Sequence, residues 1–254
     1  MPRITRHLLA VALVGLIGAS CGSDDAATTS DGDITVFAAA SLTAAFTEIG
    51  EAFTAANPDA TVTFNFAASS ELVTQIGEGA PADVFASADL NNMTKLTDAS
   101  NNGNEPVVFA TNRLEIIVGP ENPRGITGVA DLANPDLIVV TCAPEVPCGK
   151  YAAQIFDAAG VAVTPKSLEE NVKAVVAKIT LGEADAGIVY ATDVTAAGDQ
   201  AAGVEIPVDI NVVAEYPIVV TRNAANADGA QAFVDFVNSA AGQDILAKYG
   251  FLAP

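Results

Sequence analysis

Two serines in this chain stand where a strand-like segment gives way to a helix-like one. Ser41 lies in the stretch DITVFAAASLTAAF, and Ser69 lies in TVTFNFAASSELVTQI. At such a junction the first helical N–H groups have no intrahelical acceptor, and the positive end of the helix dipole favours an anion. Alanines leave room beside the backbone, and the serine hydroxyl adds a donor. One such serine is typical of a helix N-cap, but two matching junctions on one side of a sheet predict an anion site.

Catalysis by either serine would need a neighbouring base, and the sequence lacks the usual one. The only histidine, His7, lies in an N-terminal segment that we predict to be removed. This excludes a Ser-His-Asp hydrolase and a histidine-ligated metal site for the mature chain. Neither serine has the SxxK spacing of lysine-assisted serine enzymes. We therefore expect a binding protein, not an enzyme, and keep an exported serine hydrolase using Ser41 or Ser69 as the less favoured alternative.

The charge of the chain also limits its partners. Its formal net charge is −20, with only 11 lysines and arginines among 254 residues. Nucleic acids are bound through clustered basic side chains, so this composition argues against a nucleic-acid partner. An anion site in such an acidic chain must depend on local neutral donors. Asp83 and Asp89 are interpreted as residues that structure the fold or face solvent, because a carboxylate in the site would repel an oxyanion.

The N-terminal residues indicate export. Two arginines precede an apolar run over residues 8–17 that is too short to span a bilayer. The small residues before Cys21 resemble a bacterial lipobox, although Gly18 stands where leucine is usual. We predict a signal peptide over residues 1–20, lipidation of Cys21, and a flexible tether over 21–32, because that segment is small, polar and acidic. The expected location is the outer face of the cytoplasmic membrane. The alternative is an ordinary signal peptide with an unmodified thiol.

The other two cysteines fit an exported chain. Cys142 and Cys148 lie close together in TCAPEVPCGK, which favours a disulfide in an oxidising compartment. A zinc site would need further cysteine or histidine ligands, and the mature chain has no other cysteine once Cys21 is lipidated, and no histidine.

Hydrophobic periodicity predicts strands that alternate with helices. This pattern indicates parallel sheets covered on both faces, with ligands bound where the strands end and helices begin. EPVVFA and RLEIIVGP are predicted as two separate strands, and a helix is predicted over about 150–159. RLEIIVGP and AEYPIVVT are long enough to link two lobes. In SLEENV, a helix could begin after Ser167, with Glu170 completing a capping box, or after Asn171.

Several of these segments, taken in order, carry a family resemblance. VFAAASLTAAF, FAASSELVTQI followed by GAPADVFASAD, VPCGKYA, GIVYATD and KYGF together resemble the periplasmic molybdate-binding proteins, the substrate-binding components of molybdate ABC transporters. The match covers nearly all of the chain after the predicted tether. It implies an α/β type II periplasmic-binding protein fold with two lobes joined by two crossover strands. We expect lobe 1 to comprise residues 33–114 and 215–254, and lobe 2 to comprise 115–214.

The resemblance also implies which residues bind the ligand. Ser41 and Ser69 would donate through hydroxyl and backbone N–H, Cys148 and Val172 through backbone N–H, and Tyr190 through its phenol. The disulfide would then brace the Cys148 loop. From the pattern alone Val172 is interpreted as a core residue, because it begins an apolar stripe, and Tyr190 fits a half-buried strand tyrosine equally well. The binding role of Val172 requires a helix that begins after Asn171.

Molybdate or tungstate is the ligand that the resemblance implies. Both are dianions without protons at neutral pH, so a site made only of donors suits them, whereas hydrogenphosphate would also need an acceptor. Another tetrahedral oxyanion such as sulfate is the alternative. The resemblance implies no cofactor and no bare metal ion, a membrane permease as partner, contact with the membrane only through the lipid anchor, and a monomer.

Overall fold

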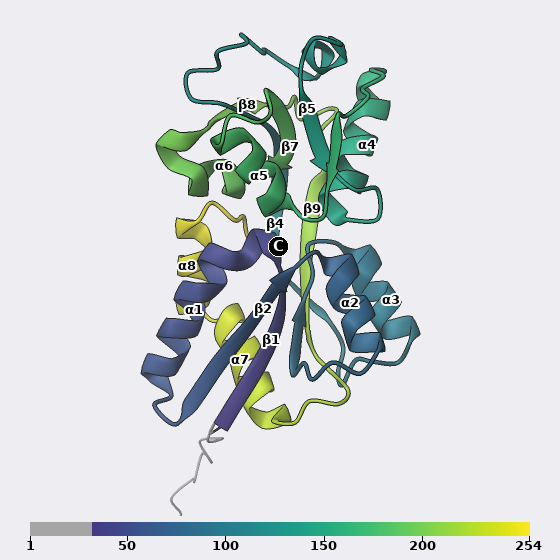
Figure 1. Cartoon of the computed structure of the whole chain (residues 1–254). Helices are drawn as coiled ribbons and strands as arrows, with labels where there is room; N and C mark the ends of the chain where they lie inside the picture. Colours follow the sequence, from purple (N-terminus) through teal and green to yellow (C-terminus); the bar gives the residue numbers. More distant parts are fainter. Residues whose placement is uncertain (1–31) are drawn as a thin grey trace, which may run out of the picture.

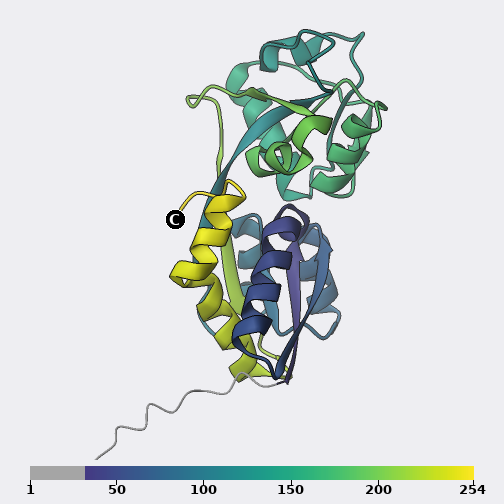
Figure 2. The same ribbon diagram turned by 90° about the vertical axis from the view of Figure 1, so that its left-hand side faces the viewer.

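The computed structural model describes residues 32–254. The predicted signal peptide (1–20), Cys21 and the predicted tether up to residue 31 lie outside the described residues. The chain forms two lobes, and two strands run between them (Figures 1 and 2). These strands are β4 (Val107–Val118) and β9 (Val213–Val220).

The first lobe is built on strands in the order β2-β1-β3-β9-β4. β1 is parallel to β2 and β3, whereas β9 is antiparallel to β3 and β4. Its other elements are β1 (Gly32–Ala39), α1 (Thr43–Ala56), β2 (Ala60–Ala67), α2 (Ser69–Gly77), β3 (Val84–Ala86), α3 (Leu90–Asp98), α7 (Ala227–Asn238) and α8 (Ala240–Lys248). A short 3-10 turn, η1 (Ala40–Leu42), joins β1 to α1. Phe46 and Phe53 lie seven residues apart on α1 and pack their rings against Phe233 at centroid distances of 6.1 and 5.4 Å.

The second lobe continues the sheet in the order β4-β7-β5-β6, with β8 on β4. Its elements are β5 (Val139–Cys142), α4 (Pro147–Ala159), β6 (Ser167–Glu169), α5 (Val172–Thr180), β7 (Ala186–Tyr190), α6 (Ala191–Ala197) and β8 (Ala202–Glu205), with the 3-10 turns η2 (Val129–Ala133) and η3 (Gly198–Gln200). Among residues 32–254, no helix has the length and apolar character to cross a membrane.

The predicted separation of EPVVFA from RLEIIVGP is wrong, because both belong to β4. The first part of β4 pairs with β9, and its second part, from Leu114, pairs with β7 and β8. The two polar residues between these segments, Thr111 and Asn112, both pair with β9 within the strand. Asn112 is buried, its Nδ2 donates to Thr192 Oγ1 at 2.9 Å, and its Oδ1 accepts from the Arg113 N–H at 2.9 Å. The chain therefore passes from one lobe to the other without a turn.

Two further expectations need correction. The sheets are mixed, because the linking strands β4 and β9 run antiparallel to their neighbours. β1 begins at Gly32, one residue before the expected start of lobe 1, because the Gly32 N–H donates to Asp59 O and Gly32 pairs with Ala60. The short strands β6 and β8 and the helix α6 were not predicted.

Candidate anion-binding site

A small cavity lies where elements of the two lobes meet, and all five predicted ligand residues line it. Its volume is about 10 Å³, far less than the roughly 300–1,000 Å³ of pockets for drug-sized ligands. None of the lining residues is charged. They are Ala39, Ala40, Ser41, Ala67, Ala68, Ser69, Ala88, Val146, Pro147, Cys148, Asn171, Val172 and Tyr190.

The first lobe contributes the two serine junctions. β1 and β2 are parallel neighbours in register, with Ala39 opposite Ala67, so both strands end at the same edge of the sheet. Ser41 lies in η1 and Ser69 is the first residue of α2, and neither serine caps its helix through its side chain. Ser41 Oγ lies 3.0 Å from Tyr216 Oη, and Ser69 Oγ accepts the Ala88 N–H at 3.0 Å. The backbone N–H groups at these helix starts have no acceptor within their own helices.

The second lobe brings the start of α4 to the cavity. This helix begins at Pro147, three residues earlier than predicted, which places Cys148 in its first turn. Proline has no N–H, so Cys148 supplies the first one. The structure contains the Cys142–Cys148 disulfide, with Cα atoms 5.7 Å apart, and this bond ties the start of α4 to the end of β5. Gly149 is required here, because a Cβ would lie 2.5 Å from the Cys142 carbonyl oxygen.

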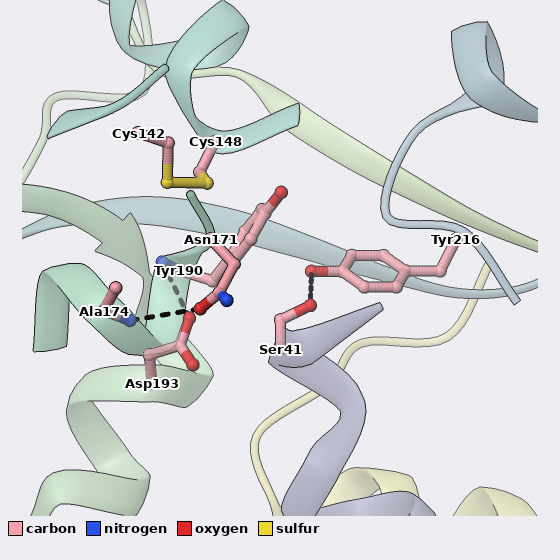
Figure 3. Close-up of a disulfide and its surroundings, with 8 residues drawn as sticks. All are labelled: Ser41, Cys142, Cys148, Asn171, Ala174, Tyr190, Asp193 and Tyr216. Carbon is pink, nitrogen blue, oxygen red and sulfur yellow. Dashed lines mark hydrogen bonds between the residues drawn. A yellow bond between two sulfur atoms is a disulfide. The ribbon is translucent and has the colours of Figure 1, made fainter. Parts of the chain in front are cut away.

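The start of α5 reaches the same cavity. Asn171 is its N-cap, and Asn171 Oδ1 accepts the Ala174 N–H at 3.1 Å (Figure 3). The structure thus selects the second of the two helix starts in SLEENV, and Ser167 lies in the edge strand β6 instead. Val172 is the first helical residue, so its N–H has no intrahelical acceptor. Its side chain is buried in the hydrophobic core, so the core interpretation also holds for the side chain.

Tyr190 ends β7 with its phenol buried at the cavity. Within residues 32–254, only Asp89 Oδ2 and Tyr190 Oη are buried side-chain polar atoms without a hydrogen-bond partner. Burial raises the pKa of Tyr190 well above its usual value, so the phenol keeps its proton. Because buried hydroxyls are normally hydrogen-bonded, this orphaned donor at the cavity indicates a missing acceptor.

The two aspartates are structural. Asp83 accepts hydrogen bonds from the backbone N–H groups of Thr35, Ala225 and Asn226 at 2.6–3.1 Å. Asp89 caps α3 by accepting the Asn92 N–H at 2.9 Å. Both are buried, at 5% and 2% exposure, so the solvent-facing alternative is wrong for both. Neither lines the cavity.

Sequence reasoning missed the contacts that join the lobes beside the cavity. Tyr151 Oη on α4 donates to Ala88 O at 3.3 Å, and Lys150 Nζ lies 3.6 Å from Asp89 Oδ2. Burial raises the pKa of Tyr151, so this phenol also stays protonated. No local pattern pointed to these contacts, because their partners lie some 60 residues apart in the chain.

Two α/β lobes joined by two strands, with a small donor-lined cavity between them, define a solute-binding protein. Residues 34–252 match the family described as bacterial extracellular solute-binding protein. The molybdate-binding protein ModA of Mycobacterium bovis is 43% identical over 251 residues, covering 96% of this chain and 95% of that protein. The chain therefore belongs to the bacterial extracellular solute-binding proteins, in the branch of the molybdate-binding proteins, and the predicted family is confirmed.

Solved structures agree on the fold. The periplasmic molybdate-binding protein of Azotobacter vinelandii has a TM-score of 0.75 at 19% identity, covering 87% of this chain and 99% of that one. The sulfate-binding protein SubI of Mycobacterium tuberculosis H37Rv has a TM-score of 0.76 at 20% identity, covering 86% of each chain. The predicted fold class is confirmed.

Proposed function

We propose that this chain captures molybdate between its two lobes and delivers it to the permease of an ABC transporter. The observation that carries the proposal is a small cavity at which the starts of η1, α2, α4 and α5 and the Tyr190 phenol meet, with no charged residue in its lining. The confirmed family and the ModA relative support the choice of molybdate.

The chemistry of the lining favours a fully deprotonated oxyanion. Helix starts and neutral hydroxyls can donate to every oxygen of a dianion. No carboxylate lines the cavity to accept a proton from hydrogenphosphate. About six charge-assisted hydrogen bonds at about 1.5–3 kcal/mol each are sufficient for micromolar binding, near −8 kcal/mol, after the cost of lobe closure. No lysine or arginine is required, which reconciles an anion ligand with an acidic chain.

The proposal assigns Ser41, Ser69, Cys148, Val172 and Tyr190 as ligand donors. Ser41 and Ser69 donate through hydroxyl and N–H groups, Cys148 and Val172 through N–H groups, and Tyr190 through its phenol. The interlobe contacts beside the cavity, Tyr151 with Ala88 O and Lys150 with Asp89, then help to hold the closed form.

Tungstate is proposed as a second ligand, because it has the charge and nearly the size of molybdate. Sulfate is the alternative ligand, because it is also a tetrahedral oxyanion. The sulfate-binding protein SubI shares the fold of this chain. We propose no catalytic role, because the oxygens of Ser41 and Ser69 already contact Tyr216 and the Ala88 N–H, and the cavity lining contains no base.

The remaining features of the proposal concern the whole protein. They are a signal peptide over 1–20, a lipid anchor on Cys21, a tether over 21–31, a monomeric body, and lobes comprising 32–114 with 215–254 and 115–214. The strand pairing of β4, which changes partner at Leu114, supports this division. No cofactor and no bare metal ion is part of the proposal.

Titration calorimetry tests the ligand. The protein is the mature chain from residue 21 with Cys21→Ser, which prevents acylation, titrated with molybdate, tungstate, sulfate and phosphate. We expect tight one-to-one binding of molybdate and tungstate and weak binding of sulfate and phosphate. Tight binding of sulfate with weak binding of molybdate would move the function to sulfate. Binding of none of the four would refute an oxyanion-binding function.

A further inference from the structure

The two cavity serines share a feature that the ligand assignment alone does not explain. Each Oγ already lies 3.0 Å from a hydrogen-bonding group of another residue. The direction of the hydrogen bond at Ser69 is fixed, because the Ala88 N–H can act only as the donor and Ser69 Oγ must accept. The single hydroxyl proton of Ser69 is therefore free for the cavity. For Ser41 the partner is the Tyr216 hydroxyl at 3.0 Å, and either oxygen could donate.

Tyr216 contacts Ser41 through its hydroxyl but does not line the cavity. It belongs to the linking strand β9 and is fully buried. Its ring packs edge-on against Phe109, Tyr190 and Phe251, with centroid distances of 6.3, 5.7 and 5.3 Å. Burial raises the pKa of Tyr216 well above its usual value, so it remains a neutral phenol with a proton to donate. Figure 3 shows its hydroxyl directed at Ser41.

The direction of this hydrogen bond decides what Ser41 offers the ligand. If Ser41 donated to Tyr216, its lone pairs would remain for the cavity and would repel an anion. If Tyr216 donates, the Ser41 proton is free to point at the anion, and the two serines then behave alike. A hydroxyl that accepts one hydrogen bond and donates another is also the stronger donor, because hydrogen bonds in a chain polarise one another.

We propose that Tyr216 is a positioning residue that donates to Ser41 Oγ and thereby fixes Ser41 as a donor to the oxyanion. This inference rests on the proposed function and adds a determinant of ligand selection. A protonated oxyanion such as hydrogenphosphate must place its own O–H against an acceptor. With Tyr216 donating to Ser41 Oγ, the Ser41 proton faces the ligand, and accepting from hydrogenphosphate would require the Ser41–Tyr216 hydrogen bond to reverse. Without the Tyr216 hydroxyl, Ser41 can turn and accept.

A double-mutant cycle on the mature chain with Cys21→Ser tests this. The proteins are the reference, Ser41→Ala, Tyr216→Phe and the double variant, each titrated with molybdate and phosphate. We expect Tyr216→Phe to weaken molybdate binding about 5- to 10-fold and to lower the selectivity for molybdate over phosphate by a similar factor. In the Ser41→Ala background, Tyr216→Phe should change the molybdate Kd less than about twofold, because its effect passes through Ser41.

Tyr249→Phe is the matched control. It removes a phenol that hydrogen-bonds Glu48 Oε2 at 2.7 Å and does not line the cavity, so its Kd should equal that of the reference. Phenylalanine at 216 keeps the ring and its aromatic neighbours, and the thermal unfolding midpoint verifies that the variant is folded.

Two results separate this inference from the proposed function. If the reference binds molybdate and Tyr216→Phe binds it equally well, or if the two substitutions simply add, Tyr216 is only a packing residue. If the reference binds no oxyanion, the proposed function fails first and this inference fails with it. Should sulfate be the tight ligand, the same cycle with sulfate tests the same inference, because sulfate is also unprotonated.

Discussion

Replacing Tyr190 with phenylalanine removes one buried hydroxyl and leaves the aromatic ring in place. The residue is 1% exposed, and its Oη has no hydrogen-bond partner within residues 32–254. A buried polar group without a partner costs stability. The ligand-free variant should therefore be no less stable than the wild type, with a gain of up to about 1 kcal/mol. For a chain of this size such a gain raises Tm by about 2–4 °C.

The same substitution should weaken ligand binding. A charge-assisted hydrogen bond from a phenol to an oxyanion contributes about 1.5–3 kcal/mol, so the molybdate Kd should rise by about 10- to 150-fold. Because burial raises the pKa of Tyr190 and keeps the phenol protonated, the loss should be the same across the neutral pH range. The opposite signs of the two effects are the specific expectation, since a packing residue would lose stability.

Titration calorimetry with molybdate and thermal unfolding of the ligand-free chain measure the two effects. Tyr249→Phe serves as control, because its hydroxyl binds Glu48 outside the cavity, and it should lose a little stability with no change in Kd. If Tyr190→Phe binds molybdate as tightly as the wild type, the phenol does not contact the ligand and the reasoning is refuted.

Three further changes test the start of α4 and the electrostatics of β4. Gly149→Ala should weaken molybdate binding about tenfold, because the new Cβ meets backbone oxygens and shifts the first turn of α4. Replacing Cys142 and Cys148 with serine should lower the free energy of unfolding by about 2 kcal/mol and weaken binding. Glu115→Gln should stabilise the fold by about 0.2–1 kcal/mol at neutral pH, because Glu115 lies opposite Glu205 in the β4–β8 pair.

Gly77→Ala has open space around the new Cβ and should leave binding unchanged; an equal loss in both glycine variants would contradict the role of Gly149. Unchanged chemical denaturation of the serine variant would show that the disulfide contributes no stability. Burial and, to a lesser extent, the charge of Glu205 raise the pKa of Glu115. The ionised Glu115 side chain therefore destabilises the folded state at neutral pH, and this destabilisation disappears as pH falls through the pKa of the folded state. A stability gain in Glu115→Gln that did not shrink on acidification would contradict this cause.

Much of the site could be predicted because its signals are local. The junctions at Ser41 and Ser69 combine a strand-like run, small residues and a helix-like run within a dozen residues of sequence, and the two periodicities are distinct. Phe46 and Phe53 follow the same helical spacing after Ser41, and both are buried. The start of α5 remained open between two local signals, and the structure selects Asn171.

Other features could not be predicted, since nothing in the local sequence encodes them. β4 is one continuous strand because its first half pairs with β9 and its second half with β7 and β8. This pairing depends on the order of strands in the sheet. The partner of Ser41 lies 175 residues away on β9, where Tyr216 stands in an ordinary strand pattern. Lys150 and Asp89 meet only because α4 of one lobe packs against residues of the other.

The sequence by itself determined the kind of protein, the lack of any histidine after His7, and the backbone junctions that can donate to an anion. Only the tertiary structure decided which donors line the cavity together, that the Tyr190 hydroxyl has no hydrogen-bond partner, and that the Tyr216 hydroxyl contacts Ser41. The reason is physical: helix starts and turn chemistry follow from neighbouring residues. The convergence of Tyr190 and the starts of η1, α2, α4 and α5 on one cavity instead follows from strand order and from the packing of one lobe against the other.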